Sequence, residues 1–286
     1  MNNLVLSTVT LCSVDTRTPL LALAAMERSM RRIRFADAVL FSHVSPELLS
    51  EAKKIGVRVV DPGPIDSVDA YSRFMMQGLL PHAKFTHVLV VQWDGFVLSQ
   101  EAWDDEFLKY DYIGAIWPER MARFPVGNGG FSLRSVKLLR ALMADEIKVT
   151  HPEDVSICDV NRAALENGHG IRFATSEVAG RFAYEHVMPS SVTFGFHGVF
   201  NLANVMDAKE ILSLVEKMSD DMYFAAGMRT LAKTLMRDGQ YDAAQRILMG
   251  RVRGGDRRWR TLSLLLRLNL RRLSGMPQNR FWKIQQ

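Results

Sequence analysis

Four short segments of the chain carry side chains that could take part in chemistry. The first is Trp93-Asp94-Gly95, where a carboxylate directly follows the apolar run from His87 to Gln92. Carboxylate oxygens are ligands for hard divalent cations, so Asp94 could hold a metal ion that bridges two phosphates. A carboxylate after a strand is also a common turn former, and that alternative stays open for Asp94.

The second segment is VGNGGFSLR, from Val126 to Arg134, in which three glycines surround an asparagine and a strand-like run follows. Glycine accepts positive φ angles and lets the backbone approach a ligand closely, so the segment could form a binding loop. A tight hairpin built on an Asn-Gly turn is an equal alternative.

The third and fourth segments add acid-base groups. His151-Pro152-Glu153-Asp154 places two acids at an expected helix start, where they would either cap the helix or supply a general base. Phe194-Gly195-Phe196-His197-Gly198 sets a single histidine among aromatic residues and glycines. Such a histidine is either a metal ligand or, more often, a hydrogen-bonded core group.

Alternating strands and helices must position these four segments. This alternation predicts a parallel sheet with helices on its faces, and chemistry in such sheets gathers at the carboxyl ends of the strands. The expected strands are residues 4–12, 38–41, 57–60 and 87–92, and the expected helices are residues 19–32, 46–55, 70–80, 136–143 and 153–167.

The pattern becomes helical after residue 201. We therefore expect two domains, residues 1–203 and 204–286. Residues 230–249 resemble one helix-turn-helix unit of tetratricopeptide repeats, and because a lone unit cannot bury its own face, it should pack on the first domain or mediate dimerisation. Residues 251–286 mix leucines with arginines and form a basic amphipathic tail.

Composition and charge exclude several classes of protein. The chain has 286 residues, 48% of them hydrophobic, a formal net charge of +5 and two cysteines, Cys12 and Cys158. No stretch approaches the roughly 20 apolar residues of a membrane span, and the first residues lack the features of a secretory signal. We therefore expect a cytoplasmic protein with two buried reduced thiols, and neither a disulfide framework nor a metal cluster.

The order and spacing of the four segments resemble the landmarks of GT-A fold glycosyltransferases: the DxD motif, the glycine loop, the xED motif and the C-terminal histidine. More closely, the motifs QWDGFVL, FLKYDYIGAIW, VGNGGFSLRS, PEDV and FGFHG are similar to a bacterial domain family of unassigned function that is usually placed among these enzymes. The resemblance implies an α/β fold of the GT-A (Rossmann-like) type, with a mostly parallel central sheet flanked by helices, followed here by a small all-helical C-terminal module.

The resemblance also implies roles for particular residues. Asp94 matches the last acid of the DxD motif and would bind Mn²⁺ or Mg²⁺ together with His197, whereas Gln92 stands where the motif has its first acid. Asp154 would be the general base of an inverting transfer, and Glu153 would orient the acceptor or the loop. The donor nucleotide would lie against Ser13, Val14, Asp15, Thr16, Arg73, Gln92 and Trp93, and the donor sugar and acceptor against Asn128, Gly129, Gly130, Asp111 and Trp117.

The activity implied is hexosyl transfer from a nucleotide sugar, with UDP-sugars favoured, to a hydroxyl of a glycan or lipid-linked acceptor, as in bacterial polysaccharide biosynthesis. Because Gln92 replaces an acid, the alternative is a non-catalytic module of the same fold that binds a nucleotide sugar or a glycan. The tail could bind nucleic acid through its arginines, but the leucines among them favour peripheral contact with an anionic membrane at its inner face. The sequence leaves a homodimer open.

Overall fold

The computed structural model describes residues 3–118 and 124–274, and the chain divides by its contacts into two compact units, residues 1–197 and 198–286. We refer to them as unit 1 and unit 2. This division lies a few residues before the predicted domain boundary at residue 203, and the assignment of each part as a domain with its own role stays a prediction.

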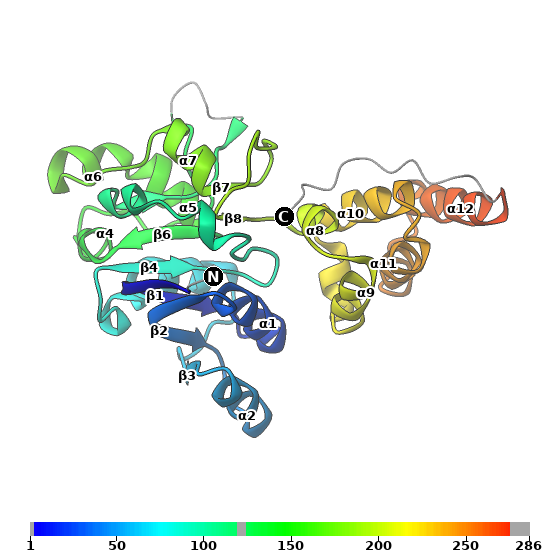
Figure 1. Cartoon of the computed structure of the whole chain (residues 1–286), viewed down its shortest axis with the longest axis horizontal. Helices are drawn as coiled ribbons and strands as arrows, with labels where there is room; N and C mark the ends of the chain where they lie inside the picture. Colours follow the sequence, from blue (N-terminus) through cyan, green and yellow to red (C-terminus); the bar gives the residue numbers. More distant parts are fainter. Residues whose placement is uncertain (1–2, 119–123, 275–286) are drawn as a thin grey trace. The chain divides into compact units, whose positions relative to one another are not determined.

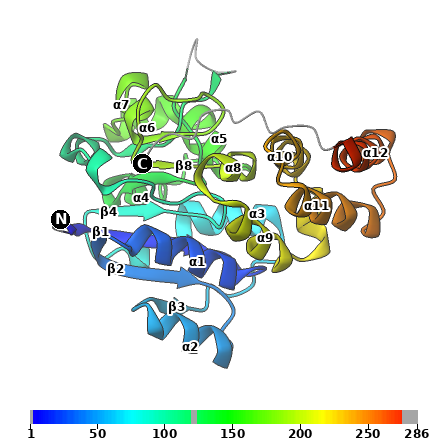
Figure 2. The same cartoon turned by 45° about the vertical axis from the view of Figure 1, so that its right-hand side comes forward.

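A six-stranded sheet with strand order β3-β2-β1-β4-β6-β5 forms the centre of unit 1 (Figures 1 and 2). The strands β1, β2, β3 and β4 pair in parallel, whereas β6 runs antiparallel to both of its neighbours. The sheet is therefore mostly parallel, as predicted. The strands are β1 (Leu4–Val14), β2 (Ile33–Phe41), β3 (Arg58–Val60), β4 (His87–Val90), β5 (Tyr112–Ile113) and β6 (Ser132–Ser135).

The reversed direction of β6 brings a loop to the carboxyl end of β4. In the antiparallel pairing, Val90 at the end of β4 lies opposite Ser132 at the start of β6. The glycine segment 127–130 immediately precedes β6, so it reaches the edge of the sheet where residues 92–95 leave β4. The sequence indicated a strand after the glycines but not its direction.

Helices cover both faces of this sheet, as predicted. Side chains of α1, such as Leu23 and Met26, pack in one apolar cluster with Leu11 of β1. Leu138 of α4 packs in a second cluster with Val88 of β4. The helices of unit 1 are α1 (Pro19–Met30), α2 (Pro46–Lys54), α3 (Val68–Arg73), α4 (Val136–Ala141), α5 (Glu153–Val155), α6 (Arg162–His169) and α7 (Ser176–Phe182).

Two helices that we predicted as continuous are divided in the structure. The expected helix 70–80 begins earlier, as α3, and continues as a π-helical turn over Phe74–Gly78. The expected helix 153–167 consists of α5, a π-helical turn over Ser156–Val160 and α6. Both the backbone N–H and the side-chain amide of Asn161 donate to Ser156 O, at 3.0 and 2.8 Å, where the second helix is divided.

Both cysteines are buried free thiols, as predicted. Cys12 and Cys158 lie in the same apolar cluster. Burial disfavours the thiolate, raising the pKa of Cys12 to about 12 and that of Cys158 in the same direction. Neither thiol is therefore activated as a nucleophile.

The described part of unit 2 contains helices and no strand. Helices α10 and α11 pack together across a turn at Gly239, whose φ is 76°; the likeness of this hairpin to a tetratricopeptide unit stays a prediction. A buried ion pair of Arg251 with Asp256, 2.7 Å between Nη2 and Oδ2, holds the connection from α11 to α12. The helices are α8 (Leu202–Val205), α9 (Ala208–Glu216), α10 (Ala226–Arg237), α11 (Tyr241–Arg253) and α12 (Trp259–Ser274).

None of the described helices combines the length and the apolar character that crossing a bilayer requires.

Candidate functional site

The four chemically interesting segments meet at the carboxyl end of β4. His197 Nε2 lies 3.5 Å from Asp94 Oδ1, which joins the histidine segment to the residues after β4. Asn128 Nδ2 of the glycine loop lies 3.0 Å from Nδ1 of the same imidazole. The next loop residue, Gly129, donates its backbone N–H to Asp154 Oδ2 at 3.1 Å. One site therefore contains parts of all four segments.

Gln92 and Asp94 both reach the Nε2 side of His197. A narrow turn joins them, since Gln92 N donates to Gly95 O and Gly95 N donates to Gln92 O, at 3.1 and 3.0 Å. Gln92 Oε1 lies 3.2 Å from His197 Nε2, close to the 3.5 Å that separates Asp94 Oδ1 from the same nitrogen. The amide of Gln92 also donates to the Tyr71 hydroxyl at 2.8 Å, and this bond points its oxygen toward the imidazole.

Glu185 contacts the other ring nitrogen of His197, a contact that we did not predict. Strand β7 (Ala183–Tyr184) pairs in parallel with β8 (Gly195–Phe196), and Tyr184 lies opposite Phe196. The residues that follow the two strands are therefore neighbours, and Glu185 Oε1 lies 3.0 Å from His197 Nδ1. A two-residue strand has no alternation to detect, so no sequence pattern marked this pairing.

The two carboxylates set the protonation of the imidazole. Burial disfavours the imidazolium, but Asp94 and Glu185 outweigh it and raise the pKa of His197 to about 10. Burial likewise opposes the charge on Glu185, yet the hydrogen bond with His197 holds the pKa of that carboxyl below its ordinary value. A cation bound at Nε2 would take the place of the proton on that nitrogen.

The donor atoms around His197 Nε2 fit a divalent cation. Ligands about 2.1 Å from one Mg²⁺-sized ion in octahedral geometry lie about 3 Å apart, close to the 3.2 and 3.5 Å found here. Among the described residues no three His, Cys, Asp or Glu side chains are grouped so as to hold a metal by themselves. The third donor here is the amide oxygen of Gln92, and Mg²⁺ sites with one carboxylate commonly complete their coordination with water and phosphate oxygens.

The glycine loop leaves no space for side chains between the histidine and the acid pair. A Cβ on Gly130 would lie 2.1 Å from His197 Nε2, and a Cβ on Gly129 would lie 2.1 Å from Glu153 Oε1. Asn128 has a φ of 68°, in the left-handed region that asparagine tolerates better than most residues. The sequence VGNGG thus suits a loop that passes between two sets of polar side chains.

Glu153 and Asp154 differ in environment although they are adjacent. Glu153 is buried and pairs with Arg134, with 3.2 Å between Oε1 and Nη2. Asp154 remains partly exposed and accepts hydrogen bonds from Gly129 N and Val155 N. Burial, with a contribution from the neighbouring Glu153 charge, raises the pKa of Asp154 above that of an ordinary aspartate. Of the two, Asp154 is the better placed to accept a proton.

Arg134 is a second residue that sequence reasoning missed. Its side chain is fully buried and donates to Met75 O, Gly129 O and Ser132 Oγ besides Glu153. An arginine in the short run FSLRS reads as a solvent-exposed end of a strand. Only the fold shows that it ties the glycine loop to the acid pair.

The residues predicted for the nucleoside lie at and beyond the end of β1. Ser13 and Val14 are buried, and Ser13 Oγ donates to Val91 O at 2.9 Å. Asp15 accepts from Thr18 N at 2.6 Å, and Thr16 Oγ1 donates to Ile65 O at 3.4 Å. These contacts serve the local fold, and a role for the four residues in donor binding stays a prediction.

Arg73 is exposed and lines a pocket of about 360 Å³. Ile65, the residue that accepts the hydrogen bond from Thr16, is also in its wall, so the pocket begins beside the loop after β1. The lining residues are Pro62, Pro64, Ile65, Ala70, Arg73, Phe74, Gln77 and Gly78.

The three remaining predicted residues, Trp93, Trp117 and Asp111, lie in different surroundings. Trp93 is half-buried beside Asp94. The Trp117 ring is packed so closely on Gly127 that a Cβ there would lie 2.1 Å from it. Asp111 is buried and accepts from Ser135 Oγ at 2.6 Å and from Arg172 N at 2.8 Å, so its oxygens support the β5–β6 corner. A contact of these residues with donor sugar or acceptor stays a prediction.

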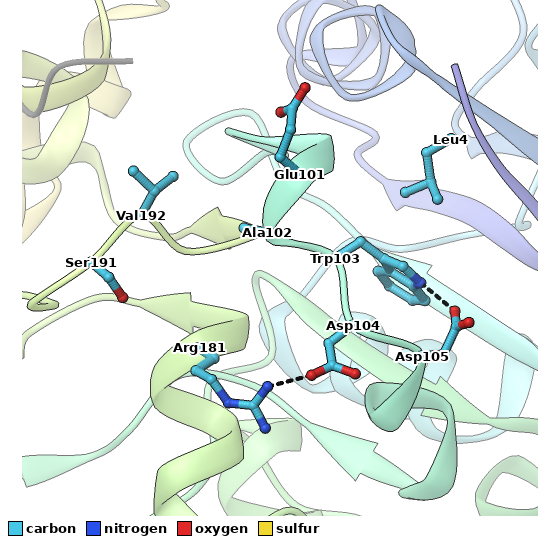
Figure 3. Close-up of a pocket in the computed structure, with 9 residues that line it drawn as sticks. All are labelled: Leu4, Glu101, Ala102, Trp103, Asp104, Asp105, Arg181, Ser191 and Val192. Carbon is cyan, nitrogen blue, oxygen red and sulfur yellow. Dashed lines mark hydrogen bonds and ion pairs between the residues drawn. The ribbon is translucent and has the colours of Figure 1, made fainter. Parts of the chain in front are cut away.

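A larger pocket, about 540 Å³, lies away from this site, beside the first residue of β1 (Figure 3). Arg181 points across it to Asp104, and Trp103 Nε1 donates to Asp105 Oδ1 at 2.9 Å. Its wall is formed by Leu4, Glu101, Ala102, Trp103, Asp104, Asp105, Arg181, Ser191 and Val192. Arg181 and Asp104 neutralise each other across the pocket, and none of the predicted site residues lines it.

A family model described as "Protein of unknown function (DUF5672)" matches residues 54–197, just over half of the chain. The chain belongs to this family. The range shared with DUF5672 ends at His197 and includes β4, the glycine loop, the acid pair and Glu185. The loop after β1, with the predicted nucleoside residues, lies outside it.

Solved structures with some likeness to this DUF5672 chain are transferases of several kinds. The mannosyltransferase PcManGT from Pyrobaculum calidifontis, in complex with GDP-Man and Mn²⁺, is 11% identical over 93% of this chain and 80% of that chain, with a TM-score of 0.44. A cytidylyltransferase from Leptospira borgpetersenii is 12% identical over 85% and 97%, with a TM-score of 0.34. A mannose-1-phosphate geranyltransferase from Thermus thermophilus is 14% identical over 66% and 73%, with a TM-score of 0.30. A comparison with curated proteins gave no match. Likenesses this distant do not indicate a shared activity.

Proposed function

We propose that the protein is a glycosyltransferase of GT-A type that moves a sugar from a nucleotide sugar, with UDP-sugars favoured, to a hydroxyl of a glycan or lipid-linked acceptor. The observation that carries the proposal is the arrangement around the glycine loop. Donor atoms of Gln92, Asp94 and His197 converge on one side of it, and the Asp154 carboxylate is bonded to it on the other. The first group suits a cation beside a diphosphate, and the second suits a base beside an acceptor.

Gln92, Asp94 and His197 would hold Mn²⁺ or Mg²⁺. When bound, the cation neutralises charge that develops on the leaving nucleoside diphosphate. The chain's own contribution is the orientation of the histidine: Glu185 accepts from Nδ1–H, so Nε2 is the nitrogen that faces Asp94 and Gln92 and would exchange its proton for the cation. Diphosphate oxygens would complete the coordination.

Asp154 would remove the proton of the acceptor hydroxyl as its oxygen bonds to the anomeric carbon and the bond to the diphosphate breaks. A direct displacement of this kind inverts the configuration at that carbon. The raised pKa of Asp154 makes its carboxylate a stronger base than an ordinary aspartate. Glu153 would act through position only, since its charge is balanced by Arg134.

A thermal-shift panel of UDP, GDP, CMP and their sugars tests this function, with each compound measured in Mn²⁺, in Mg²⁺ and in chelator. We expect one nucleotide class to stabilise the protein only with metal, by about 2.7 kcal/mol at a hundred times its dissociation constant. Asp94→Ala should lose the metal-dependent part. Stabilisation that survives the chelator would indicate a metal-free donor site. No stabilisation by any nucleotide would overturn the proposal in favour of a non-catalytic module that binds a glycan.

Glu185→Ala is expected to weaken Mn²⁺ binding by about 100-fold and Glu185→Gln by about 10-fold, because partners that orient a metal-bound histidine typically contribute 10- to 100-fold to affinity. The glutamine variant keeps an acceptor for Nδ1–H but loses the charge. The electron paramagnetic resonance signal of free Mn²⁺ measures this without any substrate. Glu216→Gln, at an exposed glutamate of α9, is the matched control. Unchanged Mn²⁺ affinity in both Glu185 variants would show that Glu185 does not support metal binding.

A further inference from the structure

Helix α12 exposes an apolar stripe along one face. Trp259, Leu262, Leu266 and Leu270 are 76%, 38%, 57% and 57% exposed. Their spacing of three, four and four residues places them on one side of the helix. We call these four residues the α12 stripe. Over its twelve residues the stripe extends for about 17 Å at 1.5 Å per residue.

The stripe is separate from the face with which α12 packs in unit 2. Thr261, Leu264 and Leu268 are buried, with at most 6% exposed, and α12 packs on α11. In helical projection these residues lie opposite the stripe. Helix α12 thus has one apolar face that unit 2 needs for its own core and another that this core does not use.

Positive charge accompanies the stripe. Arg260, Arg267 and Arg271 share one flank of the helix, and Arg260 and Arg267 are exposed. From Arg257 to Gln286 the sequence contains eight arginines and lysines and no aspartate or glutamate. The stripe therefore combines exposed apolar side chains with exposed cations along one flank, which complements a layer with apolar chains beneath anionic groups.

We propose that the α12 stripe binds the surface of an anionic lipid bilayer, with the helix in the plane of the interface. Tryptophan and leucines enter the boundary between headgroups and acyl chains, and the arginines contact the lipid phosphates. A second copy of the chain fits less well, because pairing two stripes would bring two rows of arginines together with no acid from this segment between them. Nucleic acid would pair with the arginines but leave the stripe in water. The proposal does not depend on sugar transfer.

Sedimentation of the full chain with lipid vesicles tests the proposal. We expect binding to vesicles of phosphatidylcholine with phosphatidylglycerol, weakening as salt is raised, and no binding to phosphatidylcholine alone. Leu266→Glu with Leu270→Glu should abolish binding. The matched control, Leu20→Glu with Leu49→Glu, places the same two charges at leucines of α1 and α2 that are 41% and 45% exposed, and it should bind as the unchanged protein does.

The arginines are tested separately. Arg260→Gln with Arg267→Gln is expected to weaken binding by about 30-fold, since each cation near an anionic surface contributes about 1 kcal/mol, or about fivefold. Lys53→Gln with Arg140→Gln removes two exposed cations from unit 1 and should leave binding unchanged.

The fluorescence of Trp259 tests bilayer binding even if the double leucine variant fails to fold. The emission of the full chain minus that of Trp259→Phe should shift to shorter wavelength when anionic vesicles are added. Equal sedimentation of the folded double leucine variant, or no change in the difference spectrum, would overturn the proposal.

A lipid-independent dimer that Leu266→Glu dissociates would also overturn the proposal and would assign the stripe to a second copy. Binding of duplex DNA that competes fully with vesicles and survives the leucine substitutions would assign the segment to nucleic acid.

Discussion

Asp154→Asn is expected to lower the rate of sugar transfer by about 10²- to 10⁴-fold while leaving nucleotide affinity unchanged, because general-base contributions have that size. Asparagine has the shape of aspartate and can keep one of the two backbone hydrogen bonds, from Gly129 N or Val155 N. It cannot accept the acceptor's proton. Transfer and nucleotide binding are measured on the same preparation, by product formation and by thermal shift.

The pH dependence of the proposed transfer by the unchanged protein should identify the same group. Burial and Glu153 raise the pKa of Asp154, and a protonated carboxyl cannot act as a base. The rate should therefore fall as the pH drops through a value above that of an ordinary aspartate, and it should be fully recovered above it. This acid limb should vanish from the residual activity of Asp154→Asn and remain in Asp145→Asn, which changes an exposed aspartate. Full activity in Asp154→Asn would show that Asp154 is not the general base.

Arg134→Met is expected to lower the free energy of unfolding by about 3 to 5 kcal/mol, the usual cost of leaving one member of a buried ion pair alone. The Arg134 side chain has no exposed surface and that of Glu153 is 7% exposed, so solvent compensates little for the lost partner. Urea unfolding followed by tryptophan fluorescence measures the difference.

Two further variants separate charge from packing. Arg134→Met with Glu153→Leu should recover most of the loss, because no charge then remains buried. Arg58→Met is the matched control: Arg58 Nε lies 2.9 Å from Asp37 Oδ2, but the two side chains are 31% and 18% exposed, and we expect a cost of about 1 kcal/mol or less. If Arg134→Met cost no more than Arg58→Met, the buried ion pair would not be what stabilises the acid pair.

Strands buried on both faces could be predicted from sequence because their apolar runs are continuous. Residues 87–91 are such a run, and β4 lies there. The strands β7 and β8 could not be predicted, since two residues carry no periodicity. The direction of β6 was not predicted either. Strands that alternate with helices are expected to pair in parallel, but β6 follows a loop, so the pattern did not indicate its direction.

The same distinction applies to the candidate site. The motifs around Asp94, Asn128, Asp154 and His197 were recognisable because each lies in a short and distinctive run, and the structure brings them together. The contact of Glu185 with His197 was not predicted, since it depends on the β7–β8 pairing. Arg134 depends on Glu153, 19 residues further along the chain. Contacts between residues that are far apart in the sequence could be identified only from the structure.

The position of His197 has a consequence for biosynthesis. It is the last residue of unit 1, and its partner Gln92 lies 105 residues earlier. A nascent chain that has released all six strands of the central sheet still lacks β7, β8 and the imidazole. Contacts this far apart in sequence form late because the intervening chain must first be ordered. The proposed cation site can therefore be completed only after every strand of the central sheet has been synthesised, and a chain cut short before His197 lacks the imidazole of that site.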